Sequence, residues 1–294
     1  MRVAVLRCEA LPRFVTWEIP DVDALFADDR WLLEAFAERG VEAEQVVWSD
    51  PHADWTRYDA AVLRSTWDYV DRADRFLAAM AEIAASPCRL FNPEPAVRWN
   101  ADKRYLDDLD RWGIGVVPIV RGRSADRARI ERAVDDLGWR ELVVKPAVGV
   151  GGSGVTRTTP TGLARTLDAF DPAAEVMVQP FAESVVAEGE FSYIFIGRES
   201  SHALRKRPAD GDFRAHGIYG GTVEPVTPDP DDVRDVAAMI ARLPFDLLYA
   251  RIDVVRWDGR PHVLELELIE PMLYLDLAPG SAGRLADATI ARLR

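Results

Sequence analysis

The first hundred residues alternate short apolar runs with segments of helical periodicity, and this order limits the folds that the chain can adopt. Four apolar runs are short enough to predict buried strands: residues 3–6, 46–48, 60–63 and 90–91. Two longer segments, 28–39 and 71–85, carry apolar side chains at helical spacing. Strands that alternate with helices form open, mostly parallel sheets. In such sheets ligands bind beyond the carboxyl ends of the strands, where we expect Arg7 and residues 64–68.

The pattern changes in the second half of the chain, where β-prone runs follow one another. Antiparallel strands are predicted at residues 142–145, 155–158, 176–178, 191–196 and 202–206, and a hairpin at 248–256 and 262–268. Residues 114–120 are predicted to be extended, and helices are predicted at 99–112, 125–137, 231–243 and 282–294. We therefore expect an α/β fold, with α+β character in the C-terminal half, in three parts: an α/β domain at 1–96, a lid at 97–182 and an antiparallel domain at 183–294.

The charge of the chain argues against two classes of partner. Lys and Arg number 36 and Asp and Glu 49, which gives a net charge of −13. Nucleic acid and anionic membranes both attract a positive face, so we expect neither as a partner. No apolar stretch approaches the about 18 residues of a membrane span, and charged residues interrupt the opening apolar run, so we expect a cytoplasmic protein. Homo-oligomerisation stays open.

A lysine followed by a glycine loop is the strongest local signal. Lys145 and Pro146 precede four glycines, at positions 149, 151, 152 and 154. Glycines let backbone N–H groups surround phosphate oxygens, and a lysine adds a point charge. The same glycines have dinucleotide-fingerprint spacing, but that fingerprint opens a helix, whereas residues 155–159 are β-prone. A flexible hairpin loop beside a surface lysine is the alternative interpretation.

Acidic side chains gather on the late hairpin. Asp253 stands on its first strand, and Glu265, Glu267 and Glu270 lie on or just after its second strand. Alternation places Glu265 and Glu267 on one face, where carboxylates repel each other unless a cation lies between them. Magnesium prefers such oxygen ligands. The alternative is a solvated strand face.

Basic side chains gather at Arg205, Lys206, Arg207 and Arg214 in an otherwise acidic chain. Such a cluster is typical of a clamp on a transferring phosphoryl group. The alternative is a solvated surface turn.

Together with Lys103, these signals occur in an order that resembles the ATP-grasp superfamily, specifically its glutathione-synthetase-like branch. The resembling segments are residues 90–93, 97–103, 145–154, 176–181, 189–190, 213–216 with 220–221, and 265–271. The resemblance implies an ATP-grasp fold, with ATP and one or two Mg²⁺ ions as cofactors. It implies that ATP is bound by Lys103, Lys145, Gly151, Gly152, Ser153, Gln179, Pro180, Phe181 and Glu190. It implies metal ligation by Asp253, Glu265 and Glu267, and catalysis by Arg214 and Lys206.

The chain departs from the branch at two of these positions. Pro180 stands where the adenine hinge usually has an acid, so the adenine amino group must be recognised by backbone or by Gln179. Glu267 stands where the metal motif usually has Asn, which predicts a more negative metal site.

Residues 64–69 further resemble the enzymes that close O-ureido-D-serine to D-cycloserine. We expect Arg7, Arg64, Ser65, Thr66 and Asp68 to bind a small, zwitterionic amino acid, because arginine suits a carboxylate and aspartate an ammonium group. The predicted reaction activates a carboxyl group as an acyl phosphate for attack by a nitrogen nucleophile. An intermolecular amino-acid or peptide ligase, or a non-catalytic ATP-binding protein, is the alternative. The structural interpretation of residues 64–69 is that Trp67 and Tyr69 only pack against the next helix and Asp68 caps it.

Overall fold

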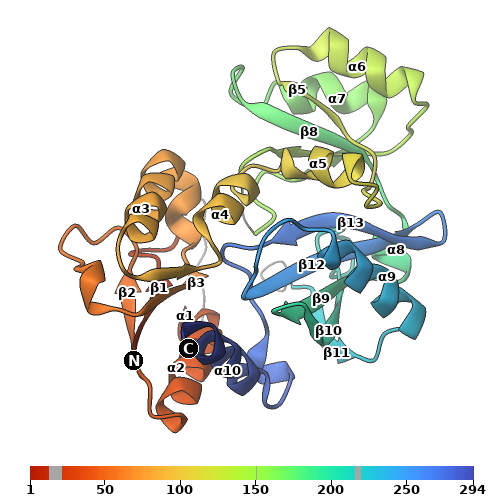
Figure 1. Cartoon of the computed structure of the whole chain (residues 1–294). Helices are drawn as coiled ribbons and strands as arrows, with labels where there is room; N and C mark the ends of the chain where they lie inside the picture. Colours follow the sequence, from red (N-terminus) through yellow and green to blue (C-terminus); the bar gives the residue numbers. More distant parts are fainter. Residues whose placement is uncertain (13–21, 150, 216–219) are drawn as a thin grey trace.

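The computed structural model describes residues 1–12, 22–149, 151–215 and 220–294, and it contains three sheets with their covering helices (Figure 1). The first sheet is parallel and the other two are antiparallel, which confirms the predicted fold class. His216, one residue of the predicted phosphate loop, lies outside the described residues. No helix in the described ranges is long and apolar enough to span a membrane.

The N-terminal sheet has the strand order β2 (Glu42–Val47), β1 (Arg2–Arg7), β3 (Ala60–Ser65) and β4 (Arg89–Phe91). Its central strands are buried on both faces, which explains their unbroken apolar runs. One face packs against α2 (Ala27–Glu38) and the other against α3 (Ala73–Ala85). The short elements α1 (Val22–Leu25), η1 (Trp55–Arg57) and η2 (Trp67–Asp71) complete this part.

Strand β2 is longer than the run at 46–48 predicts, because it is an edge strand. An edge strand has one solvated side, so polar residues are accepted there. Glu42 and Glu44 both pair with Arg2 of the neighbouring strand. Hydropathy alone therefore misses the first half of the strand.

The lid sheet has the order β5 (Val120–Arg123), β8 (Glu175–Pro180), β6 (Leu142–Pro146) and β7 (Thr156–Thr158). Helices α6 (Arg127–Asp136) and α7 (Pro160–Leu167) cover one face and form a separate apolar core with it. Leu142 and Val144 point into this core. Strand alternation then directs Val143 and Lys145 to the opposite face, toward the C-terminal sheet.

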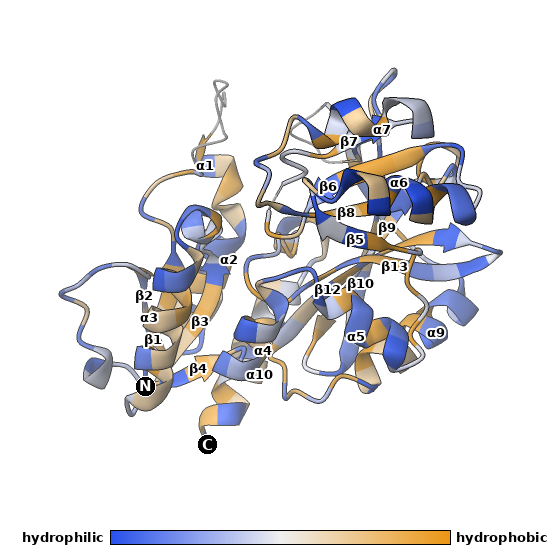
Figure 2. Cartoon of the chain, turned by 90° about the horizontal axis from the view of Figure 1, so that it is seen from above, coloured by the Kyte–Doolittle hydropathy of each residue, from blue (hydrophilic) through white to orange (hydrophobic). Residues whose placement is uncertain are grey.

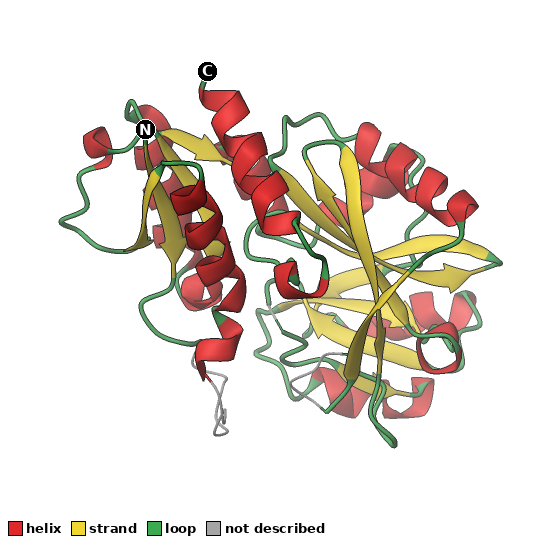
Figure 3. Cartoon of the chain, turned by 90° about the horizontal axis from the view of Figure 1, so that it is seen from below, coloured by secondary structure: helices red, strands yellow, loops and turns green. Residues whose placement is uncertain are grey.

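The C-terminal sheet has five strands in the order β11 (Thr222–Val226), β10 (Glu199–Arg207), β9 (Glu190–Ile196), β12 (Tyr249–Trp257) and β13 (Arg260–Glu267). Figure 3 shows it as the largest block of strands. Its surroundings include α4 (Glu94–Asn100), α5 (Tyr105–Arg111), α8 (Ser184–Ala187), α9 (Pro230–Ala241) and η4 (Leu275–Leu277). Figure 2 shows apolar residues concentrated on the strands and on the helix faces that cover them.

The prediction of one helix at 99–112 is wrong, because the chain breaks between α4 and α5. The Asp102 carboxylate accepts the backbone N–H of Arg104 at 2.8 Å, a local bond that competes with helix formation. The backbone N–H of Lys103 donates to Ala147 O at 2.9 Å, so the break ties this segment to the lid.

The three predicted domain limits stay a prediction. The hydrophobic cores of the structure cross these limits at two places. Side chains between Ala96 and Val116 pack in the core of the C-terminal sheet, although the predicted lid begins at residue 97. The C-terminal helix α10 (Ser281–Leu293) packs against α2 of the N-terminal part, where Arg39 pairs with Asp287 at 2.6 Å.

Candidate active site

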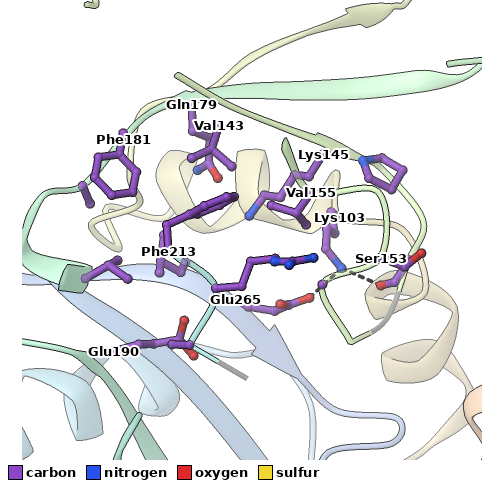
Figure 4. Close-up of a pocket in the computed structure, with 18 of the residues that line it drawn as sticks. Lys103, Val143, Lys145, Ser153, Val155, Gln179, Phe181, Glu190, Phe213 and Glu265 are labelled. Atoms are coloured by element: carbon purple, nitrogen blue, oxygen red, sulfur yellow. Dashed lines mark hydrogen bonds and ion pairs between the residues drawn. The ribbon is translucent and has the colours of Figure 1, made fainter. Parts of the chain in front are cut away.

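A pocket of about 890 Å³, partly open to solvent, lies between the lid sheet and the C-terminal sheet (Figure 4). In Figure 4, Phe181 lies at one end of this pocket, and Lys103 and Ser153 lie at the other. All nine residues predicted to bind ATP line it: Lys103, Lys145, Gly151, Gly152, Ser153, Gln179, Pro180, Phe181 and Glu190. Arg214 and Glu265 also line the pocket. Segments far apart in sequence therefore converge as predicted.

The end of the pocket near Phe181 is largely apolar. Val143, Phe181 and Phe213 lie toward this end in Figure 4, and Val155, Val185 and Leu264 also line the pocket. Gln179 is buried, and its amide N–H donates to Val117 O at 3.0 Å. That bond fixes the orientation of the amide. Such a slot, with a few fixed polar groups, suits a flat heterocyclic base.

The glycine loop forms the polar roof at the other end. Gly151, Gly152 and Gly154 have φ of 62°, 71° and 70°, a left-handed conformation that favours glycine. Without side chains in the way, successive backbone N–H groups can approach an anion. Val150 lies outside the described residues.

Lys103 joins this loop to the acidic strand below it. Its Nζ lies 2.5 Å from Glu265 Oε1 and donates to Gly149 O at 2.9 Å. Burial lowers the pKa of Lys103, but Glu265, Glu267 and Glu270 together outweigh burial, and the pKa lies above its ordinary value. The same pair holds the pKa of Glu265 below its ordinary value against the effect of burial.

Lys145 has no comparable partner. No carboxylate lies within ion-pair distance of its Nζ among the described residues. Burial therefore lowers the pKa of Lys145 to about 8, with Glu265 opposing and Lys103 adding to the shift. A desolvated lysine at the edge of a pocket is stabilised by an incoming anion.

Beneath the pocket, β9, β10, β12 and β13 contribute a buried ion network. Lys206 is fully buried and pairs with Glu190 at 3.0 Å and Asp253 at 3.1 Å. Arg251 pairs with Asp253 at 2.9 Å and also with Glu267. Lys206 therefore lies below the pocket floor and not on its wall, which excludes a solvated surface turn at this residue; its role in a clamp on the phosphoryl group stays a prediction.

The three predicted metal ligands lie on the paired strands β12 and β13. Asp253 stands directly opposite Glu265, and Glu267 is two residues further on. Burial, Glu265 and Asp253 raise the pKa of Glu267 to about 7, although Arg251 opposes them. Within the described residues, no group of three acidic, His or Cys side chains is arranged to hold a metal ion. The carboxylates are paired with Lys103, Lys206 and Arg251 instead, and metal ligation by them stays a prediction.

Arg214 lines the pocket and pairs with Asp212 at 2.7 Å. The hydrogen bond from Arg214, together with two backbone N–H groups, lowers the pKa of Asp212 far below its ordinary value. The guanidinium is thus held at the pocket by a fixed carboxylate.

The predicted substrate residues lie at the carboxyl ends of β1 and β3, as expected, but they are bonded to protein. Arg64 is buried, and its Nη2 donates to Asp28 at 3.2 Å and to Pro271 O at 2.9 Å. Arg64 Nε and Nη1 are buried without a hydrogen-bond partner among the described residues. Both nitrogens still have a hydrogen bond to donate, and Nε lies 3.9 Å from Asp29 Oδ1. Substrate contact by Arg64 stays a prediction.

The remaining four residues of the set are equally constrained. Ser65 donates to Asp29 at 2.5 Å, and Arg7 donates to Gln45 at 3.2 Å. Asp68 accepts Trp48 Nε1 at 2.5 Å and Arg72 at 2.5 Å. The Thr66 hydroxyl is buried and has no hydrogen-bond partner in the described ranges. Their substrate contacts also stay predictions.

Sequence reasoning missed Arg251, the cation between Asp253 and Glu267. The signal was present, because residues two apart on a strand share a face. Asp28 was also missed. In the sequence, an aspartate near the start of a helix looks the same whether it caps that helix or binds a distant loop.

Comparison with known proteins agrees with this architecture. A model of the N-terminal domain of D-cycloserine synthetase DcsG matches residues 3–92, and a model of the RimK-like ATP-grasp domain matches residues 116–271. The chain is 36% identical over 288 residues to the cycloserine biosynthesis protein DcsG of Streptomyces lavendulae, covering 90% of this chain and 93% of that protein.

Solved structures agree as well. A crystal structure of D-cycloserine synthetase DcsG has a TM-score of 0.85 and 31% identity, and it covers 100% of both chains. A D-alanine–D-alanine ligase from Bacillus anthracis, complexed with ATP, shares the fold at a TM-score of 0.68 and 16% identity, covering 100% of this chain and 97% of that one. The chain therefore belongs to the RimK-like ATP-grasp family, and it is an ATP-dependent, ADP-forming ligase that makes carbon–nitrogen bonds.

Proposed function

We propose that this ligase closes O-ureido-D-serine to D-cycloserine. The observation that carries the proposal is that the likeness to DcsG extends over residues 3–92 as well as the ATP-grasp part. The ATP-grasp part supplies nucleotide chemistry to many ligases, whereas the N-terminal part is where we expect the amino acid to bind. Similarity in that part supports a shared substrate class.

The proposed reaction has two bond-forming steps. A carboxylate oxygen of the substrate attacks the γ-phosphorus of ATP, and ADP leaves. The nitrogen next to the ether oxygen then attacks the acyl carbon, the ring closes and phosphate leaves. Because the ring nitrogen of the product carries only hydrogen, the carbamoyl group must also leave, and its hydrolysis gives carbon dioxide and ammonia.

For the nucleotide, we propose the roles that the pocket supports. Lys103, Lys145 and the backbone of Gly151, Gly152 and Ser153 hold the phosphates, because they line the polar end. Gln179, Pro180 and Phe181 lie along the base, and Glu190 binds the ribose. Arg214 stabilises charge on the transferring phosphoryl group, and Lys206 supports it from beneath the floor. Catalysis of this kind is mostly positioning and electrostatics.

For the metal, we propose Asp253, Glu265 and Glu267 as ligands of one or two Mg²⁺ ions. Oxygen ligands suit magnesium, and the raised pKa of Glu267 is typical of a carboxyl group whose charge is incompletely balanced. Magnesium supplies charge neutralisation on the phosphates when bound. If Glu265 and Glu267 bind magnesium, their ion pairs with Lys103 and Arg251 are broken. Both cations are then free to bind anionic groups of the ligands.

On the substrate side, we propose that Arg7, Arg64, Ser65, Thr66 and Asp68 shape a site for a small amino acid. The unpartnered Nε and Nη1 of Arg64 support a carboxylate contact there. We also propose the division into an N-terminal substrate domain, a lid and a metal-binding C-terminal domain.

A substrate screen tests the proposed function. The protein is incubated with ATP, magnesium and O-ureido-D-serine, and ADP and D-cycloserine are followed by chromatography and mass spectrometry. The L-enantiomer is the matched control, and we expect at least tenfold slower release of ADP with it. If ADP release instead requires two separate amino acids and yields a dipeptide, the cyclisation is wrong and an intermolecular ligase replaces it.

A further inference from the structure

The 271–275 loop lies three residues beyond the end of β13, and three of its carbonyl groups are held by side chains from other parts of the chain. Arg64 donates to Pro271 O at 2.9 Å and Arg251 to Met272 O at 3.1 Å. A ring nitrogen of His202 lies 2.8 Å from Leu273 O. Three side chains from β3, β12 and β10 therefore fix one short segment.

Asp28 fixes the N–H groups of the same 271–275 loop. Its carboxylate accepts the backbone N–H of Leu273 at 2.5 Å, Tyr274 at 3.1 Å and Leu275 at 2.8 Å. It also pairs with Arg64 at 3.2 Å and is buried. One side chain of the N-terminal helix α2 thus binds three consecutive amides from a segment some 245 residues further along the chain.

Tyr274 stands at the centre of these contacts in an unusual backbone conformation. Its φ is 52° and its ψ is 49°, the left-handed region that a non-glycine residue rarely adopts. Such a conformation persists only where the surroundings over-determine it. Asp28 and the three carbonyl contacts provide that constraint, so the loop presents the Tyr274 side chain in one direction.

The phenol of Tyr274 lies near the ion network, because Arg251 of that network donates to Met272 O, two residues before Tyr274, at 3.1 Å, and the network charges act on the phenol. Burial raises its pKa, the cations Lys206 and Arg251 lower it, and Asp253 and Glu267 raise it. The side chain is half-buried, and its hydroxyl has no hydrogen-bond partner among the described residues. A polar group held this firmly, beside the acidic strand and without a partner, is free to bind a ligand.

We propose that Tyr274 is a specificity-determining residue for the amino-acid substrate, and that Asp28 is the positioning residue that presents it. Beside the Arg251 cation, the phenol donates a hydrogen bond to the substrate carboxylate, the group that must reach the phosphoryl donor. Asp28 acts through the loop and, by its ion pair with Arg64 at 3.2 Å, through that side chain as well. This inference rests on the proposed function, because it assigns a binding partner to the carboxylate that accepts the phosphoryl group in the same reaction.

The alternative is that Asp28 and Tyr274 only stabilise the fold. A double-mutant cycle separates the two roles. Tyr274→Phe, Asp28→Asn and the double variant are compared for the KM of the amino acid, the dissociation constant of ATP and the melting temperature. Asp29→Asn is the matched control, because this buried neighbour bonds Ser65 and Gln45 but no amide of the loop.

We expect Tyr274→Phe to raise the KM of the amino acid about tenfold, the typical effect of one hydrogen bond to a charged group, with ATP affinity unchanged. Asp28→Asn should raise it similarly in the native background and by a clearly smaller factor in the Tyr274→Phe background, where only its ion pair with Arg64 is left to act. Asp29→Asn should change the KM of the amino acid by the same factor in the native protein and in Tyr274→Phe. Independent effects of Asp28→Asn and Tyr274→Phe on KM would overturn the positioning role.

Tyr274→Gly covers the case in which Asp28→Asn does not fold. Glycine adopts the left-handed conformation readily, so this variant keeps the loop and removes the phenol. We expect an unchanged or higher melting temperature and a KM raised at least tenfold. An unchanged KM in both Tyr274 variants would refute the inference. The substrate is whichever amino acid releases ADP with the native protein, so failure of O-ureido-D-serine alone refutes the proposed function and not this one.

Discussion

The lowered pKa of Lys145 leads us to expect that ATP binding depends on pH. In the free protein, burial lowers the pKa of this lysine to about 8. Phosphate oxygens placed against Lys145 stabilise its charged form, so the pKa rises again in the complex. ATP binding is then accompanied by proton uptake, and affinity is lost as pH rises through the pKa of the free protein.

The size of the effect follows from the pKa. At pH 7 nearly all Lys145 is charged, whereas at pH 9 about one molecule in eleven is. The dissociation constant of ATP should therefore rise about tenfold between pH 7 and pH 9, which is about 1.4 kcal/mol. Half a proton should be taken up per ATP near pH 8.

Isothermal titration calorimetry in two buffers of different ionisation enthalpy measures both quantities. Magnesium is omitted, so that Glu267 keeps its Arg251 partner. Lys145→Arg is the control, because guanidinium stays charged throughout this range. The difference in pH dependence between the native protein and Lys145→Arg gives the contribution of Lys145, because all other titrating groups are common to both proteins. Equal pH profiles for the two proteins would refute the reasoning.

Three further predictions concern contacts of the site and of its supports. Glu265→Gln frees Lys103 from its ion pair, so ATP without magnesium should bind several-fold tighter in calorimetry, while added magnesium should improve binding less than in the native protein. Arg64→Ala should raise the KM of the amino acid more than tenfold in an ADP-release assay and leave the dissociation constant of ATP unchanged; a large loss of ATP affinity would argue against its place on the substrate side. Asn92→Ala removes a buried amide that bonds Tyr249 O, Leu268 O and Leu248 N–H, so urea denaturation should show a free energy of unfolding lower by about 3 kcal/mol, and a change below 1 kcal/mol would contradict it.

The sequence brings together side chains that line one pocket, because several of them lie on regular strands and the others on a glycine loop. The alternation of β6 places Lys145 and Val143 on one face, and the glycine spacing marks backbone that readily adopts left-handed conformations beside them. Both follow from local rules, and both hold in the structure.

The ion network beneath the pocket could not be predicted in the same way. Whether Lys206 faces solvent or the floor depends on the register of β10 against β9 and on the covering loop, which local sequence does not specify. The same limit applies to Asp28, since its three amide partners are determined by how α2 docks against the 271–275 loop. Charges that pair across domains are therefore visible only after the chain is folded.

The packing of α10 against α2 has a consequence for synthesis of the chain on the ribosome. Arg39 and Asp287 meet across 248 residues, and apolar side chains of both helices share one core with β1 and β3. While the chain is being translated, the apolar side of α2 that α10 later covers stays exposed until the last helix emerges. We therefore expect the N-terminal half to be a substrate for chaperones during translation, and to commit to its native packing late.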